Sequence, residues 1–130
     1  MASTLWPPIM QNPPPRDMAE MLYDLAKDIS VLTSGRLDFH IDAVGIGGIG
    51  AVTHIRYNCY LRVVKKAYLH LLFRVTTEVG SPFPAEFATP EGDPIPNASD
   101  KNELEQRIQT ILQRPRTSDI LHYLLKIAPP

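Results

Sequence analysis

Three histidines fall where the sequence pattern could bring them onto one surface. His40, His54 and His70 all occupy polar positions in three consecutive segments of alternating polarity. Asp42 lies opposite His54 if the first two segments form a hairpin with residues 47–49 as its loop. Imidazole and carboxylate groups in such an arrangement can ligate zinc, or act as a general base with its orienting partner. On that register His40 and His54 are two positions out of line, so we expect solvated histidines without a metal or a catalytic role.

A second chemical possibility is the stretch GIGGIG, residues 45–50, which matches the dinucleotide-binding pattern G-x-G-x-x-G. That pattern binds a pyrophosphate where a helix follows it directly, because the helix N-terminus faces the phosphates. Residues 51–57 are instead rich in β-branched and aromatic types, and the next acid is Glu78, too late for ribose recognition. We therefore predict a hairpin turn. Its tip is apolar, and Ile46 and Ile49 either pack under the proline-rich segments or are exposed for a partner.

The register of this hairpin follows from keeping the apolar residues of both segments on one face. A shift of one residue would move every side chain of one strand to the other face. A three-residue loop of residues 47–49, with glycine at its left-handed position, avoids that conflict. It sets Ile41 opposite Ile55 and Phe39 opposite Tyr57.

Arginine and tyrosine gather on the same predicted polar face. Together with the two isoleucines of the hairpin tip, they are the residues that we expect to contact a partner: Ile46, Ile49, Arg56, Tyr60, Arg62, Tyr68 and Arg74. Both residue types are enriched at protein interfaces, although on an open sheet they can also stack single-stranded bases. Asp38, Asp42 and Glu78 flank the patch, and no RNP-like run is present. A protein partner or self-association is the favoured interpretation, a solvated face comes second, and nucleic acid third.

Cysteine usage and charge limit the class of protein further. Cys59 is the only cysteine, which excludes an internal disulfide and fits a reducing compartment. It falls at an apolar strand position, so we expect a buried thiol rather than a nucleophile. The net charge of −1 gives no general attraction for nucleic acid or an anionic membrane. Residues 1–15 lack the pattern of a signal peptide, and residues 43–55 are too short and glycine-rich to cross a bilayer as a helix, so we expect a cytoplasmic protein.

The elements that must position these residues are readable from periodicity. Residues 16–32 repeat apolar types at helical spacing, and the segment ends at Gly35. Residues 36–42, 53–64 and 67–79 alternate in period two, as strands with one covered face do.

The last third of the chain reads as a loop followed by two helices. A short edge strand at residues 83–87 is compatible with its prolines. Asp100 and Glu103 are spaced as a capping box at the start of a helix that Pro115 ends. Thr117 or Ser118 then caps the final helix.

The sequence as a whole predicts an α+β domain over residues 16–130, preceded by a proline-rich N-terminal arm, residues 1–15. Its order is an N-terminal helix, an antiparallel meander of three or four strands, and two C-terminal helices, with all helices on the sheet's apolar face. We expect a non-catalytic cytoplasmic interaction or adaptor module that uses the open sheet face and the glycine hairpin, with no cofactor and no metal. A single-stranded nucleic-acid-binding module and a small metal- or histidine-dependent enzyme are the alternatives.

Overall fold

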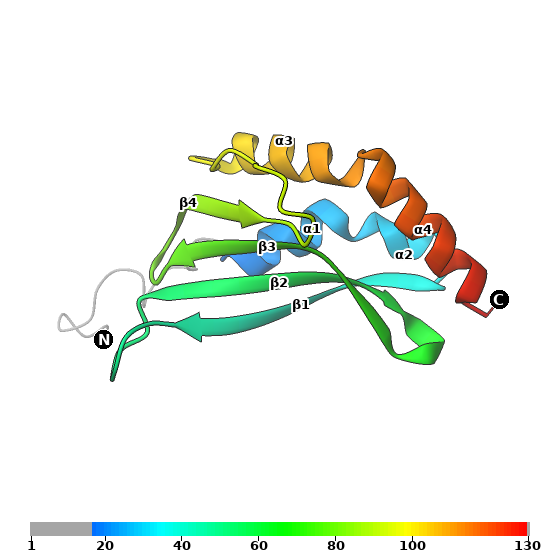
Figure 1. The fold of residues 1–130 in the computed structure, drawn as a ribbon, viewed down its shortest axis with the longest axis horizontal. Coiled ribbons are helices and arrows are strands. Elements are labelled where there is room, and N and C mark those ends of the chain that lie inside the picture. The colour runs from blue at the N-terminus through cyan, green and yellow to red at the C-terminus, as the bar shows by residue number, and fades with distance from the viewer. Residues whose placement is uncertain (1–16, 130) are drawn as a thin grey trace, which may run out of the picture.

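Four antiparallel strands form the sheet around which the chain is built (Figure 1). The computed structural model describes residues 17–129. Along the chain the elements are α1 (Met18–Ala26), α2 (Asp28–Leu32), β1 (Leu37–Ile46), β2 (His54–Val63), the 3₁₀ turn η2 (Val64–Lys66), β3 (Tyr68–Glu78), β4 (Ser81–Ala88), α3 (Lys101–Leu112) and α4 (Pro115–Ile127). The strands lie in the order β1-β2-β3-β4, so each pairs with the next. The predicted α+β arrangement is confirmed; the predicted arm, residues 1–15, lies outside the described residues.

One face of the sheet is buried beneath the helices and holds the hydrophobic core. Alternate residues of β1 and β2 point into it, and α1, α3 and α4 each contribute an apolar side. The largest buried side chains include Phe73, Met18, Leu22, Leu37, Leu72, Leu104, Ile111 and Leu124. Helices α1 and α2 contact β1, whereas α3 lies beside β4 (Figure 1). The helical layer therefore consists of two pairs: α1–α2 toward β1, and α3–α4, of which α3 lies beside β4 and α4 lies at the end of the sheet where β1 and β3 begin (Figure 1).

The first helical segment is broken at Lys27 into two helices. Asp17 caps α1 by accepting a hydrogen bond from the backbone N–H of Glu20 at 2.8 Å. Gly35 ends the segment as predicted, with a left-handed φ of +76° and its N–H donating to the carbonyl of Ser30 at 2.8 Å. Helix α2 has no fully buried residue: Ile29 packs partly against the core, whereas Val31 and Leu32 are exposed.

The β1–β2 hairpin has a longer first strand and a longer loop than predicted, whereas β2 is slightly shorter than predicted. The loop spans residues 47–53, so the predicted three-residue loop is wrong. The observed pairs are Phe39 with Leu61, Ile41 with Cys59, and Ile46 with His54, each four positions further along β2 than predicted. A shift by an even number of residues leaves every side chain on its predicted face. The predicted faces of β1 and β2 are therefore confirmed even though the register is wrong.

A β-bulge changes the direction of the first side chains in β3. Phe73 pairs with Cys59 but Leu71 pairs with Tyr60, so Leu72 is an extra residue in β3. Both Leu72 and Phe73 are buried in the core. The four residues before the bulge therefore point to the opposite face from the one that strict alternation predicts.

Strand β4 lies at the sheet edge, as predicted, and is followed by the segment that leads into α3. Ala85 exchanges two backbone hydrogen bonds with Ala98, at 2.8 and 2.9 Å, on the side away from β3. Asp100 then caps α3 by accepting from the N–H of Glu103 at 2.9 Å. The Glu103 carboxylate accepts from the N–H of Ser99 at 2.8 Å. The predicted capping box is present in this shifted form.

Helix α4 begins at Pro115, earlier than predicted. Arg114 is its N-cap residue, and Pro115 occupies the first turn, where its missing N–H costs no hydrogen bond. Neither Thr117 nor Ser118 caps the helix. Thr117 is buried, and its hydroxyl donates to the carbonyl of Ile111 at 2.6 Å, which ties the end of α3 to α4.

Candidate functional site

The face of the sheet turned away from the helices, called the open face below, carries most of the residues predicted to contact a partner. Even-numbered residues of β1 and β2 lie on it, because the odd-numbered ones point into the core. Arg56, Tyr60 and Arg62 lie there as predicted. Arg74 of β3 lies there too, since it pairs with Asn58 of β2. These four residues therefore share one surface.

Two of the three arginines on the open face are held by neighbouring polar side chains. Arg62 and Asp38 form a two-point ion pair, in which Nε donates to Oδ1 at 2.9 Å and Nη2 donates to Oδ2. Arg74 Nε donates to Asn58 Oδ1 at 3.1 Å. A phosphate would have to compete with Asp38 for the Arg62 guanidinium.

Tyr68 and His70 do not lie on the open face, contrary to the prediction. The bulge sets them opposite Val63 and Leu61, whose side chains are buried under the helices. They point toward α4, where they lie with Arg116 around a shallow hollow. Tyr68 therefore does not belong to the surface formed by the other predicted contact residues.

Leu69 and Leu71 occupy the open face in their place. They pair with Arg62 and Tyr60 of β2. Leu69 is 39% exposed, and Leu71 is half-buried. The only sequence feature that indicated this change of face was the apolar run of residues 71–73. It interrupts the alternation, as a β-bulge does.

The hairpin tip beside this face is an apolar turn. Ile49 is fully exposed and Val52 is exposed, whereas Ile46 is half-buried. A Cβ on Gly47 would lie 1.9 Å from the carbonyl oxygen of Ala51, so the turn requires glycine there. Strand β2 follows the loop directly, and a phosphate-binding helix N-terminus is absent at this point of the described chain. The glycine-rich stretch thus forms a hairpin, as predicted.

The three histidines are not brought together. His40 pairs with Tyr60, whereas His54 lies six residues away along β2, or about 20 Å in a strand. His70 points to the other face. Across residues 17–129, no group of three or more histidine, cysteine or acidic side chains is arranged to hold a metal ion. His40 Nε2 instead lies 3.0 Å from Asp42 Oδ1, on its own strand.

The hollow between β3 and α4 is the polar site that the bulge creates. It has a volume of about 250 Å³ and is lined by Tyr68, His70, Arg116, Asp119, Ile120 and Tyr123. Partial burial lowers the pKa of His70, and the positive charge of Arg116 lowers it further, so the imidazole is neutral at pH 7. Arg116 Nε lies 3.4 Å from Glu91 Oε1, so its charge is met by an ion pair. The hollow offers hydrogen-bonding groups, and its lining within the described chain includes no serine, threonine or cysteine beside the imidazole.

Cys59 is buried in the core, as predicted from its strand position. Its Sγ lies 3.7 Å from the carbonyl oxygen of Tyr57. Burial raises the pKa of the thiol well above its ordinary value. A thiol that stays protonated and out of contact with water is a poor nucleophile.

In comparisons with known proteins, no protein-family model, curated protein or solved structure matches the chain. Within residues 17–129, no helix is long and apolar enough to cross a membrane.

Proposed function

We propose that this chain is a non-catalytic protein-interaction module that binds a partner protein, or a second copy of itself, through the open face and the hairpin tip. The observation that carries the proposal is the pair Leu69 and Leu71 beside Tyr60, near the η2 end of a face that lies opposite all the described helices. The function needs no cofactor and no metal.

The layout of the open face resembles a protein interface more than an ordinary wet surface. Interfaces commonly have an apolar or aromatic centre with a polar rim. Here Tyr60 packs near His40, with ring centroids 6.1 Å apart, and the two leucines lie on the adjacent strand. The ion pair of Arg62 with Asp38 borders them. Apolar groups held among paired charges favour association with another protein surface.

The hairpin tip extends this surface beyond the end of the sheet. Ile49 projects fully into water, with Val52 near it. Such a tip can insert into a hollow on a partner without any change in the sheet. We propose that Ile46 and Ile49 contribute to the same contact as Arg56, Tyr60 and Arg62. A cytoplasmic location, which fits a lone buried cysteine, belongs to this proposal as well.

The test changes the apolar cluster of the open face, formed by Tyr60, Leu69 and Leu71. The double variant Leu69→Asp with Tyr60→Ala should lose its partner set in a pull-down read by mass spectrometry, or dissociate a homodimer in sedimentation velocity. Removal of central interface residues typically costs about 1–4 kcal/mol of binding free energy, whereas surface substitutions alter folding little. Circular dichroism should therefore stay native.

The matched control is Tyr123→Asp, which introduces the same charge at an exposed large side chain of α4, away from the open face and the hairpin tip. It should leave both the assembly state and the partner set unchanged. If the double variant behaves like this control while its fold stays native, the open face is only solvated surface and the proposal fails.

A further inference from the structure

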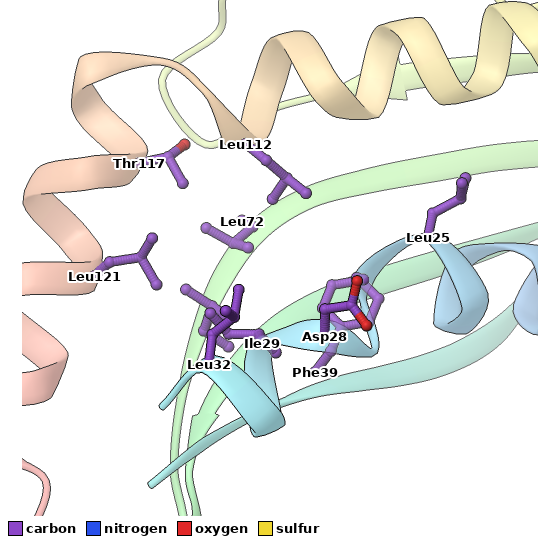
Figure 2. A pocket seen from close by; sticks show the side chains of 11 residues that line it. Leu25, Asp28, Ile29, Leu32, Phe39, Leu72, Leu112, Thr117 and Leu121 are labelled. Carbon is purple, nitrogen blue, oxygen red and sulfur yellow. The ribbon is translucent and has the colours of Figure 1, made fainter. Parts of the chain in front are cut away.

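A groove runs along the opposite side of the molecule, between the helix pairs α1–α2 and α3–α4. Its apolar end has walls formed by Leu25, Ile29, Leu32, Leu112 and Leu121, which point toward one another from the two helix pairs (Figure 2). Phe39, Leu61 and Leu72 of the sheet also line it. A second hollow shares Leu25 and Leu112 with it and continues along α3. We call these two connected hollows the helical groove.

The size of the apolar end sets what can enter it. Its volume is about 160 Å³. A small-molecule site usually measures about 300 Å³ or more, whereas an apolar cavity of about 150 Å³ accommodates a benzene ring. The apolar end therefore fits one branched aliphatic or aromatic side chain. The hollow along α3 adds about 540 Å³ of more polar space, enough for neighbouring side chains of the same segment.

Apolar side chains are also exposed at the rim of the groove. Val31 and Leu32 of α2 are each 80% exposed. Of the apolar residues of α2, only Ile29 packs against the core, so Val31 and Leu32 contribute little to it. Large apolar groups that lie in water beside an apolar hollow mark an interaction surface.

The charges around the groove are acidic. Asp28 lines the apolar end and Glu105 lines the hollow along α3, and the lining within the described chain includes no lysine or arginine. The remaining polar groups of the second hollow are amides, among them Gln106 and Gln109. A segment with basic side chains would find charge complementarity here, and an acidic one would be repelled.

We propose that the helical groove binds an amphipathic helix of a partner protein, with one large apolar side chain in the cavity and lysine or arginine side chains toward Asp28 and Glu105. A helix laid into an apolar groove uses apolar residues at i, i+3, i+4 and i+7. Helix α3 has 12 residues, so it flanks a partner helix of similar length, about 18 Å. This site lies on the face opposite the open face, so it stands apart from the function proposed above.

The probe is a fluorescein-labelled peptide of about 14 residues with leucines at helical i, i+3, i+4 and i+7 positions and lysines elsewhere. The matched control peptide has glutamate in place of lysine. The full-length protein should bind the lysine peptide at least about tenfold more tightly than the glutamate peptide in fluorescence anisotropy. Asp28→Asn combined with Glu105→Gln should remove most of that difference.

Two variants of the protein separate groove binding from general stickiness. Leu32→Asn removes an apolar wall residue. It should lower the affinity for the lysine peptide by about tenfold, as loss of an interface side chain commonly does. Val79→Asn makes the same kind of change in the β3–β4 turn and should have no effect. The methyl resonances of Leu112 and Leu121 should shift on titration with the peptide, whereas that of Leu69 on the open face should not.

Other occupants give different results. Equal affinity for both peptides would overturn the proposal. So would an equal loss of affinity for the lysine peptide in Leu32→Asn and Val79→Asn. If Leu32→Asn abolished self-association in sedimentation velocity while no peptide bound, the occupant would be a second copy of the chain. If Trp6→Ala strengthened peptide binding by tenfold or more, the chain's own N-terminal segment would be the occupant. Either outcome rejects a partner helix without bearing on the open face.

Discussion

Arg36 shows how a single side chain holds the last helix in place. It lies just before β1, yet its Nη2 donates to the carbonyls of Leu125, at 2.5 Å, and Ala128, at 2.9 Å. These carbonyls lie at the C-terminal end of α4, which carries the negative end of the helix dipole. The guanidinium therefore joins the start of the sheet to the end of the chain by charge and by hydrogen bonds.

Replacing this arginine should destabilise the fold. We expect Arg36→Ala to lower the free energy of unfolding by about 2 kcal/mol, because hydrogen bonds that involve a charged group contribute about 1.5–3 kcal/mol. Equilibrium unfolding in urea measures this change in the free energy of unfolding. The control is Arg56→Ala, an exposed arginine of the open face, which should change stability by less than about 0.5 kcal/mol. Equal effects of the two variants would show that Arg36 is no more than a surface charge.

At the scale of elements, the loop of the β1–β2 hairpin requires glycine at Gly47 but not at the adjacent Gly48. A Cβ on Gly47 would meet the backbone of Ala51 and Thr53, whereas a Cβ on Gly48 would meet nothing within 4 Å. Backbone atoms on both sides of the turn cannot move apart without breaking the bond from the N–H of Thr53 to the carbonyl of Ile46, at 2.8 Å. The two adjacent glycines therefore make a matched pair of test positions.

We expect Gly47→Ala to destabilise the protein by about 1–2 kcal/mol, and Gly48→Ala to change its stability by less than about 0.5 kcal/mol. Hydrogen exchange of the amide of Thr53 should accelerate in the first variant only. Similar exchange and similar unfolding midpoints in both variants would contradict the observed loop.

The strands show what periodicity can and cannot predict. Alternation gave the correct faces for β1 and β2, because an even shift in register preserves them. It gave the wrong face for Tyr68 and His70, because β3 offers two apolar phases, one through Leu69 and one through Leu72. Only packing chooses between them: the bulge lets Leu72 and Phe73 both enter the core. The broken first helix is a similar case, since the apolar stripe continues through Lys27 while the backbone does not.

At the scale of the whole molecule, the balance of charge on the open face opposes nucleic-acid binding. Its basic side chains are Arg56, Arg62 and Arg74, and its acidic ones are Asp38, Asp42, Glu78 and Glu86. Three positive and four negative charges leave this face with a charge of 3 − 4 = −1. A face without net positive charge releases few counterions from a phosphate backbone, and that release is the main source of affinity for nucleic acid.

We therefore expect no measurable binding of a fluorescent single-stranded oligonucleotide in anisotropy titrations at about 50 mM salt, and no change at about 200 mM. A variant with Asp38→Asn and Asp42→Asn, which raises the charge of the face, serves as the control for sensitivity and should bind weakly. Tight binding by the natural chain that weakens steeply with salt would favour a nucleic-acid partner over a protein.

The two surfaces differ in how far the sequence predicted them. Arg56, Tyr60 and Arg62 were predicted on the open face from parity alone, and the structure places them there. The helical groove was not predicted, because the residues of its walls read as an ordinary core stripe. Whether such a stripe is buried depends on how closely two helix pairs approach each other. In this fold they leave Leu32 in water and Leu25 only partly covered.

The bulge at Leu72 gives this protein an unusual freedom in evolution and engineering. In a regular strand, the loss of one residue turns every side chain beyond it to the opposite face. Here Leu72 is the residue without a partner on β2, so its removal would restore a regular ladder while Leu71 and Phe73 keep their present partners. Leu72 also lines the apolar end of the helical groove. The width of that groove can thus change through a one-codon deletion that leaves the opposite surface as it is.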